Sequence, residues 1–173
     1  PGVGGHCIAV DPWFIVDSAP EQAQIIRKAR EINDSKPHYV INKIKQAADQ
    51  FKKPVIACLG LAFKADIDDL RESPALDIAM SLLHDNVGDI LLVEPNIKQL
   101  PKKYAEHNAR LTTLPQALER ANVLVVLVDL DLVLHIDCGA NLNTPLDVHI
   151  LILKSLKLIC RGSPLNWLRG ERR

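Results

Sequence analysis

The alternation of polar and apolar positions over residues 18–53 predicts one amphipathic helix, because the apolar residues recur at helical spacing. The residues that carry this apolar stripe are Val40, Ile44, Ala47 and Phe51. Ser18 and Glu21 have the spacing of a capping box and predict where the helix begins. Pro37 interrupts the middle, so either the helix kinks there or two helices meet end to end. The stripe is open to two interpretations, core packing or a connector and subunit-interface helix.

Three short apolar runs follow, each with the length of a strand that is buried on both faces. They are residues 55–59, 89–93 and 123–128. Helices are predicted between them, over residues 73–83 and 114–121. The order strand, helix, strand, helix, strand predicts a doubly wound α/β fold with parallel strands. We therefore expect an α/β protein in which a long central helix is followed by a Rossmann-like parallel-sheet domain.

The segment after the first strand, residues 60–73, is rich in charge and lies where ligands bind in such sheets. Lys64 and Arg71 are suited to phosphate or carboxylate groups. The alternative is a solvated loop whose charges pair with one another. Gly60 does not begin a Gly-x-Gly-x-x-Gly motif, so the usual phosphate-binding loop of a dinucleotide site is not predicted. Cys58 lies inside the strand and is interpreted as a packing residue.

Residues 1–17 form a glycine-rich loop around Cys7, which lies four residues before Asp11. A thiol in this setting favours a nucleophile over a core residue. Asp11 is open to two interpretations, a carboxylate that orients or deprotonates a water and a residue that caps the next turn. The chain begins in this loop and its single methionine is Met80, so we expect it to be a piece of a longer protein.

The composition narrows the class of protein. With 173 residues, 47% of them hydrophobic, the chain has the make-up of a globular protein of one or two domains. Basic and acidic residues are equal in number, 21 of each, so there is no electrostatic footprint for a nucleic-acid partner. The four cysteines lack paired Cys-x-x-Cys spacing, which predicts reduced thiols, no metal site and a cytoplasmic location. No membrane partner is expected.

Two motifs, in this order, resemble those of the nucleotide-sugar 6-dehydrogenases, the UDP-glucose/GDP-mannose dehydrogenase family. They are Gly-Val-Gly-Gly-His-Cys-x-x-x-Asp-Pro at residues 2–12 and Gly-Leu-Ala-Phe-Lys-x-Asp-x-Asp-Asp-x-Arg-Glu-Ser-Pro at residues 60–74. The resemblance covers the first 129 residues. It implies that residues 54–129 bind a UDP-sugar and that the central helix, residues 18–53, forms a homodimer. It also implies NAD as cofactor, with the main NAD-binding domain absent from this chain.

The same resemblance implies an oxidation of the sugar C6 alcohol to a carboxylate in two hydride transfers. Cys7 would add to the intermediate aldehyde, and oxidation of the thiohemiacetal would give a thioester for water to cleave. Asp11 matches the carboxylate near that water. Arg71 matches a residue that reaches toward NAD. The positions that match substrate-binding residues are Gly4, Phe63 and Lys64.

Residues 130–173 depart from the family pattern and are interpreted as a divergent tail that lacks the expected final strands. The apolar stretch 146–159 is compatible with either a helix or a strand. Two hypotheses follow from the whole pattern. The chain is a fragment of a nucleotide-sugar dehydrogenase, inactive by itself, or it is a non-catalytic nucleotide-sugar-binding or dimerisation module, including the product of a pseudogene.

Overall fold

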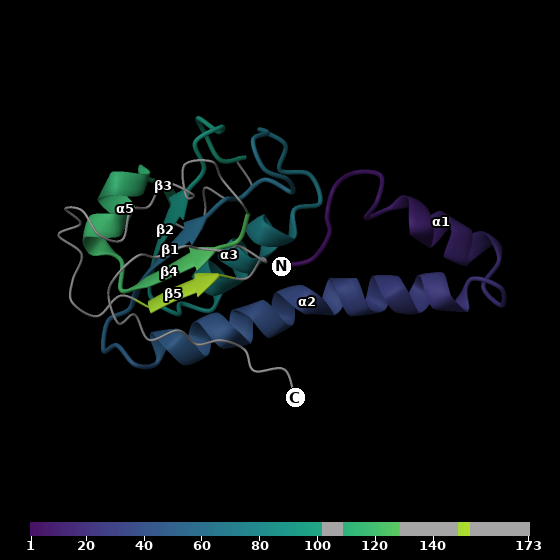
Figure 1. The fold of residues 1–173 in the computed structure, drawn as a ribbon, viewed down its shortest axis with the longest axis horizontal. Coiled ribbons are helices and arrows are strands. Elements are labelled where there is room, and N and C mark those ends of the chain that lie inside the picture. The colour runs from purple at the N-terminus through teal and green to yellow at the C-terminus, as the bar shows by residue number, and fades with distance from the viewer. Residues whose placement is uncertain (102–108, 129–148, 153–173) are drawn as a thin grey trace, which may run out of the picture.

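The computed structural model describes residues 1–101 and 109–128 and the backbone of residues 149–152 (Figure 1). The centre is a five-stranded sheet in the order β3-β2-β1-β4-β5, and all of its neighbouring strands are parallel. The strands are β1 Val55–Leu59, β2 Asp89–Val93, β3 Arg110–Leu111, β4 Val123–Val126 and β5 His149–Ile152. The predicted α/β class with a Rossmann-like parallel sheet is therefore confirmed.

Helices cover both faces of the sheet. The covering helices are α2 Gln24–Ala48, α3 Pro74–His84 and α5 Leu114–Arg120, whereas α1 Asp11–Ser18 packs against α2. One core cluster joins α2 and α3 to alternate strand residues such as Ile56 and Ile90, and a second joins α5 to the intervening ones, such as Ala57 and Leu91. This alternation makes a three-layer domain, because successive strand side chains point to opposite faces. Both faces are buried, which explains why β1, β4 and the part of β2 after the exposed Asp89 are apolar.

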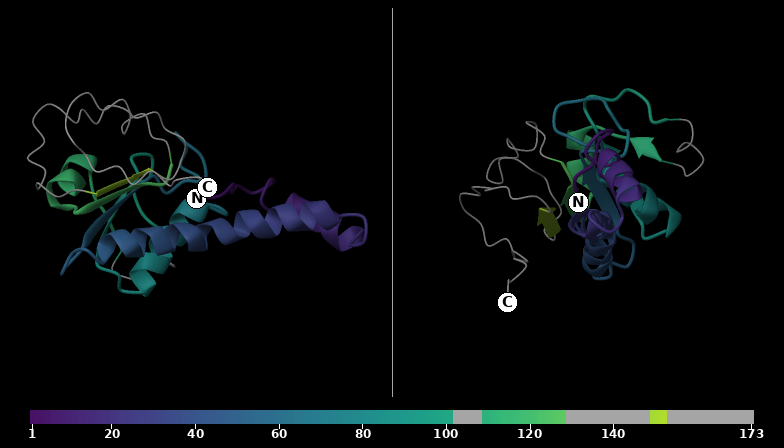
Figure 2. Two further views of the ribbon diagram at one scale, coloured as in Figure 1. Left: turned by 60° about the horizontal axis from the view of Figure 1, so that its bottom comes forward. Right: turned by 90° about the vertical axis from the view of Figure 1, so that its right-hand side faces the viewer.

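The long helix α2 lies under the sheet along only part of its length. Its second half carries the core residues Val40, Ile41 and Ile44, whereas its first half continues beyond the sheet (Figure 1). There α1 folds back beside it, as the turned view also shows (Figure 2). No described helix has the length and hydrophobicity needed to cross a membrane.

The predicted start of the central helix is wrong. Ser18 ends α1, and its hydroxyl donates to the carbonyl of Phe14 at 2.7 Å, so Ser18 is not an N-cap. Pro12 suits the first turn of α1, and α2 begins only at Gln24 without any side-chain cap. A helix that starts without a cap leaves no local sequence signal. Residues 18–53 therefore divide into the end of α1, a connection and α2, which itself ends at Ala48.

Pro37 lies inside α2, which runs through it as one helix, so the alternative of two helices meeting end to end is wrong. Proline has no N–H to donate to the carbonyl four residues earlier, that of Asn33. The turn that follows Pro37 packs into the core through Val40 and Ile41.

The predicted strands and helices of the sheet domain match the structure closely. Residues 55–59 and 89–93 are strands at their predicted bounds, and the third strand ends two residues earlier than predicted. Ser73 accepts a hydrogen bond from Leu76 N at the start of α3, with Pro74 in the first turn. Cys58 is fully buried, which confirms its interpretation as a packing residue.

Two strands differ from the sequence prediction. The two-residue β3 is too short to leave a periodic pattern. Beyond residue 129, the expectation that the chain lacks a further strand is wrong, because β5 pairs with β4 in parallel over four residues. Of the two alternatives for residues 146–159, the strand is confirmed over His149–Ile152, which extends the sheet edge. The rest of the predicted tail, residues 130–148 and 153–173, lies outside the described residues.

Candidate functional site

Three segments meet beyond the carboxyl end of β1. They are the cysteine loop (residues 2–9), the Gly60 loop (residues 60–64) and the Arg71 loop (residues 69–73). Gly5 N donates to the carbonyl of Glu72 at 3.1 Å, which joins the cysteine loop to the Arg71 loop. Ser73 Oγ donates to the carbonyl of Leu61 at 2.7 Å, which joins the Arg71 loop to the Gly60 loop. The three loops therefore form one connected unit.

Close packing at Gly4 allows this contact. Gly4 is buried, and a Cβ at this position would lie 2.1 Å from the carbonyl oxygen of Glu72 and 2.5 Å from Cδ of Pro74. Any side chain would push the cysteine loop away from the Arg71 loop. The structure thus gives this glycine a packing reason within the protein. Its close approach to a bound sugar stays a prediction.

The predicted residues Phe63 and Arg71 lie beside His6, the neighbour of Cys7. The rings of His6 and Phe63 make an edge contact, with centroids 6.3 Å apart and planes at 81°. A guanidinium nitrogen of Arg71 is 3.5 Å from Nδ1 of His6. The structure therefore brings the cysteine loop together with Phe63 and Arg71, two predicted site residues that follow Cys7 by 56 or more positions in the sequence.

Arg71 is held in place by Asp69. Its guanidinium donates to both carboxylate oxygens of Asp69, at distances between 2.6 and 3.1 Å. These hydrogen bonds lower the pKa of Asp69 to about 2. The pKa of Arg71 is raised, chiefly by hydrogen bonding with Asp69 and then by the negative charge of Asp69. A positive charge is thus fixed next to the cysteine loop.

The sequence left open that residues 60–73 form a solvated loop whose charges pair with one another. This interpretation is correct for Arg71 and Asp69 but not for Lys64. Lys64 is exposed, and none of the ion pairs among the described residues includes it. Its ammonium group remains available for an anionic ligand, since a compact point charge suits a phosphate.

The two cysteines of the described residues differ sharply. Cys7 is exposed, whereas Cys58 is buried. Burial raises the pKa of the Cys58 thiol to about 12, so it is almost entirely protonated near neutral pH. Because the thiolate is the reactive form, Cys7 is the candidate nucleophile and Cys58 is inert.

Asp11 lies one turn after Cys7, as the exposed first residue of α1. Its backbone N–H donates to the carbonyl of Cys7 at 2.8 Å. The helix makes no side-chain cap hydrogen bond, and its N-cap is Val10, so the capping interpretation of Asp11 is wrong. A carboxylate in a first turn still complements the helix dipole. The role of Asp11 toward a water stays a prediction.

Sequence reasoning assigned no role to Glu94, which follows β2 directly. Glu94 is 4% exposed, and its Oε2 accepts hydrogen bonds from the backbone N–H groups of Leu61 at 2.8 Å and Ala62 at 3.2 Å. In a dinucleotide-binding fold, N–H groups at this place in the first loop hold phosphate. Here a carboxylate of the protein takes them. This agrees with the lack of a Gly-x-Gly-x-x-Gly motif and fixes the loop that carries Phe63 and Lys64.

Two cavities adjoin these elements. One of about 300 Å³ lies between the cysteine loop, α2 and α3, with Gly4, Trp13 and Arg30 in its lining. The other, of about 460 Å³, lies beyond β2 and β3 with Glu94 and Lys98 in its lining. The part of the chain that the structure describes contains no group of side chains able to hold a metal ion.

The fold and the site define the class of protein: a Rossmann-like α/β domain that carries an exposed thiol on a loop packed beyond its first strand. The model for the UDP-glucose/GDP-mannose dehydrogenase family, UDP binding domain, matches residues 57–147. The chain belongs to this family, which confirms the resemblance of its two motifs. The family match extends past residue 129, whereas the relatives described below align over 128 or 129 residues, a length that agrees with the predicted extent of the resemblance.

Individual relatives agree with this assignment. The chain is 60% identical over 129 residues to an NDP-N-acetyl-D-galactosaminuronic acid dehydrogenase of Ralstonia nicotianae, covering 75% of this chain and 30% of the relative. It is 61% identical over 128 residues to the UDP-N-acetyl-D-mannosamine dehydrogenase of Campylobacter jejuni, covering 73% of this chain and 31% of the relative. A solved UDP-N-acetyl-mannosamine dehydrogenase from S. aureus is similar with a TM-score of 0.66 at 30% identity, covering 88% of this chain and 38% of that one. The chain thus spans about a third of the length of the proteins it matches.

Proposed function

We propose that the chain is the C-terminal part of an NAD-dependent UDP-N-acetyl-D-mannosamine 6-dehydrogenase. The observation that carries the proposal is the packing of the cysteine loop onto the Gly60 and Arg71 loops, with Arg71 3.5 Å from the neighbour of Cys7. Residues 6–14 and 29–34 resemble this enzyme in particular. Relatives at 60% and 61% identity carry two different sugars in their names, so the choice of sugar rests on that resemblance.

The substrate half of the site follows from the exposed groups of the three loops. Lys64 pairs with the diphosphate of the nucleotide, because its ammonium group is exposed and outside every ion pair of the described residues. Phe63 lines the sugar pocket through the ring that contacts His6. The backbone at Gly4 approaches the sugar from the cysteine loop.

Cys7 supplies the covalent step. NAD, when bound, accepts the hydride in each of the two oxidations. The Cys7 thiolate adds to the C6 aldehyde, the new C–S bond makes a thiohemiacetal, and loss of a hydride and a proton converts it to a thioester. Water then cleaves the thioester, releasing the carboxylate and the thiol. Asp11 orients or deprotonates this water, and Arg71 offers a positive charge toward the cofactor.

The main NAD site lies outside these residues. The N–H groups that would hold its diphosphate at the first strand are bonded to Glu94, so the described loop does not fit the group. Without a hydride acceptor the thiol performs no oxidation. We therefore propose that the 173 residues alone are inactive as a dehydrogenase.

A homodimer through α2 is also part of the proposal. Ile25, Ile32 and Tyr39 recur every seven residues on α2 and are 84%, 56% and 53% exposed. A stripe at this spacing is suited to pairing with a second helix. Light scattering should find dimers of the chain and a shift toward monomers in Ile25→Glu, while Gln24→Glu at the neighbouring exposed position stays dimeric. Wild-type protein that is monomeric at all tested concentrations refutes this part.

The resemblance to UDP-N-acetyl-D-mannosamine dehydrogenase also implies the product, UDP-N-acetylmannosaminuronate, which serves the synthesis of enterobacterial common antigen. We place this reaction in the cytoplasm, where thiols stay reduced.

A second candidate function is a non-catalytic nucleotide-sugar-binding or dimerisation module. For these residues taken alone, two observations favour such a module: the backbone N–H groups of the Gly60 loop are already bonded to Glu94, and the Gly-x-Gly-x-x-Gly motif is missing. An in-frame coding sequence for a glycine-motif domain upstream of Pro1 favours the enzyme, whereas a stop codon there favours the module.

An activity assay tests the proposal. The chain, produced with any in-frame upstream domain, is mixed with NAD and UDP-N-acetylmannosamine. We expect two NADH per sugar consumed, since the oxidation from alcohol to acid removes four electrons. The 173 residues alone should bind UDP and make no NADH. The absence of UDP binding contradicts the proposal, as does NADH formation by the 173 residues alone.

A further inference from the structure

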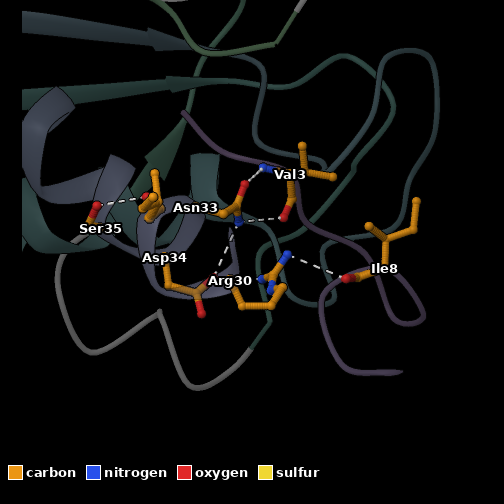
Figure 3. A network of polar contacts seen from close by, with 7 residues as sticks. Val3, Ile8, Arg30, Asn33, Asp34 and Ser35 are labelled. Carbon is orange, nitrogen blue, oxygen red and sulfur yellow. Dashed lines mark hydrogen bonds and ion pairs between the residues drawn. The ribbon is translucent and has the colours of Figure 1, made fainter. Parts of the chain in front are cut away.

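The side chain of Asn33, on α2, makes two hydrogen bonds to the backbone of one residue in the cysteine loop. Val3 N donates to Asn33 Oδ1 at 2.8 Å, and Asn33 Nδ2 donates to the carbonyl of Val3 at 3.0 Å (Figure 3). An amide side chain is able to satisfy both backbone groups at once because it carries a donor and an acceptor. This pair fixes the position of the loop four residues before Cys7.

Arg30, one turn earlier on α2, contacts the cysteine loop on the C-terminal side of Cys7. Its guanidinium donates to the carbonyl of Ile8 at 3.4 Å and to Asp34 Oδ1 at 2.6 Å (Figure 3). The same oxygen of Asp34 accepts from Asn33 Nδ2 at 3.3 Å. Asp34 thus orients both residues, and the loop is held at Val3 and at Ile8, on either side of Cys7.

The burial of Arg30 is costly in stability. Arg30 is 9% exposed, and its Nε is buried without a hydrogen-bond partner among the described residues. A buried donor without a hydrogen-bond partner is unfavourable for folding. A buried polar atom that lacks a hydrogen-bond partner is expected mainly where function requires a particular geometry.

Helix α2 carries both Asn33 and Arg30, whose hydrogen bonds to Val3 and Ile8 are called the clamp below. Its second half packs into the core under the sheet through Val40, Ile41 and Ile44, while Arg30 and Asn33 lie on the half that extends beyond the sheet. The Gly60 and Arg71 loops are fixed to that same sheet and to α3. The helix therefore sets where the cysteine loop stands relative to Phe63 and Arg71.

We propose that Asn33 and Arg30 are positioning residues that hold the cysteine loop on both sides of Cys7 and so fix the thiol relative to the substrate-binding loops. The catalytic consequence rests on the proposed function, whereas the effect on the loop does not. Misplacement of a reacting group by about 1 Å costs on the order of 100-fold in rate. Loss of the Asn33 pair should therefore lower kcat about 10- to 100-fold. The KM for the UDP-sugar should change less than kcat, because Lys64 and Phe63 lie on a different loop and only the proposed sugar contact of Gly4 lies on the cysteine loop.

Two measurements on Asn33→Ala test the proposal, with Asn42→Ala as the matched control on an exposed position of the same helix. Hydrogen exchange of the amides of residues 3–8 should be at least about tenfold faster in Asn33→Ala and unchanged in Asn42→Ala. Asn33→Asp retains the acceptor for Val3 N and loses the donor, so its exchange should be intermediate. This variant also serves if Asn33→Ala does not fold.

The outcomes separate the clamp from the proposed function. Unchanged loop exchange in both Asn33 variants overturns the clamp, whatever the enzyme activity. Faster exchange with unchanged kcat in the full-length enzyme overturns its role in positioning the thiol. If exchange is faster in the Asn33 variants but the full-length wild-type protein makes no NADH, the clamp stands and the dehydrogenase is refuted.

Discussion

Replacing Cys7 with alanine in the proposed full-length dehydrogenase should stop the oxidation to the acid and leave at most one NADH per UDP-sugar. The first hydride leaves from the alcohol without help from a thiol. The second requires addition to the aldehyde, for which Cys7 is the only exposed thiol among the described residues. We expect formation of the carboxylate to fall by at least about 10³-fold, in the range seen when a catalytic nucleophile is removed. Product analysis by mass spectrometry and NADH absorbance measures both oxidation steps.

His38→Ala is a suitable control, since His38 is exposed on α2 and outside the three loops. It should leave two NADH per sugar. A Cys7→Ala enzyme that still releases two NADH per sugar contradicts the covalent role of the thiol.

Substituting Gly4 with alanine should destabilise the chain by about 2–3 kcal/mol, the upper range for inserting an atom into a packed site. The added Cβ would lie 2.1 Å from the carbonyl oxygen of Glu72, a backbone atom that has no rotamer with which to move away. The hydrogen bond from Gly5 to Glu72 should break as the loops separate. Urea denaturation measures the loss in the free energy of unfolding.

Val3→Ala is the control for this prediction. Val3 lies in the same loop and is 54% exposed, so the change should stay below about 0.5 kcal/mol. Equal stability of Gly4→Ala and the wild type would show that the cysteine loop is not packed on the Arg71 loop.

The sheet was the part of the fold that the sequence predicted best. The runs at residues 55–59 and 89–93 are buried on both faces apart from the exposed Asp89, so they are almost entirely apolar and differ from the sequence around them. The start of α2 was missed because Ala23 caps nothing, while Ser18 and Glu21 only resemble a capping box. Local spacing does not tell whether a serine begins a helix or ends the previous one.

For the candidate site, the two motifs predicted Cys7, Phe63 and Arg71 as one group, and the structure brings their loops together. Glu94 and Asn33 received no role from the sequence. Both side chains bind backbone groups about 30 residues away in the sequence. Every residue except proline has the same backbone groups, so the sequence does not show which of them a side chain will bind. Their contribution becomes visible only when the fold brings the segments into contact.

Protection of Cys7 by nucleotide tests the central claim most directly. Peptide mapping after timed treatment of the chain with iodoacetamide gives the labelling rate of Cys7, with the buried Cys58 as an internal negative control. UDP-N-acetylmannosamine should slow labelling of Cys7 at least about tenfold, with a dose dependence that matches its binding, because ligand on the three loops covers the thiol. Lys64→Ala should shift this dependence to higher concentrations. Labelling of Cys7 at an unchanged rate while the UDP-sugar is demonstrably bound would contradict a single site built from the cysteine, Gly60 and Arg71 loops.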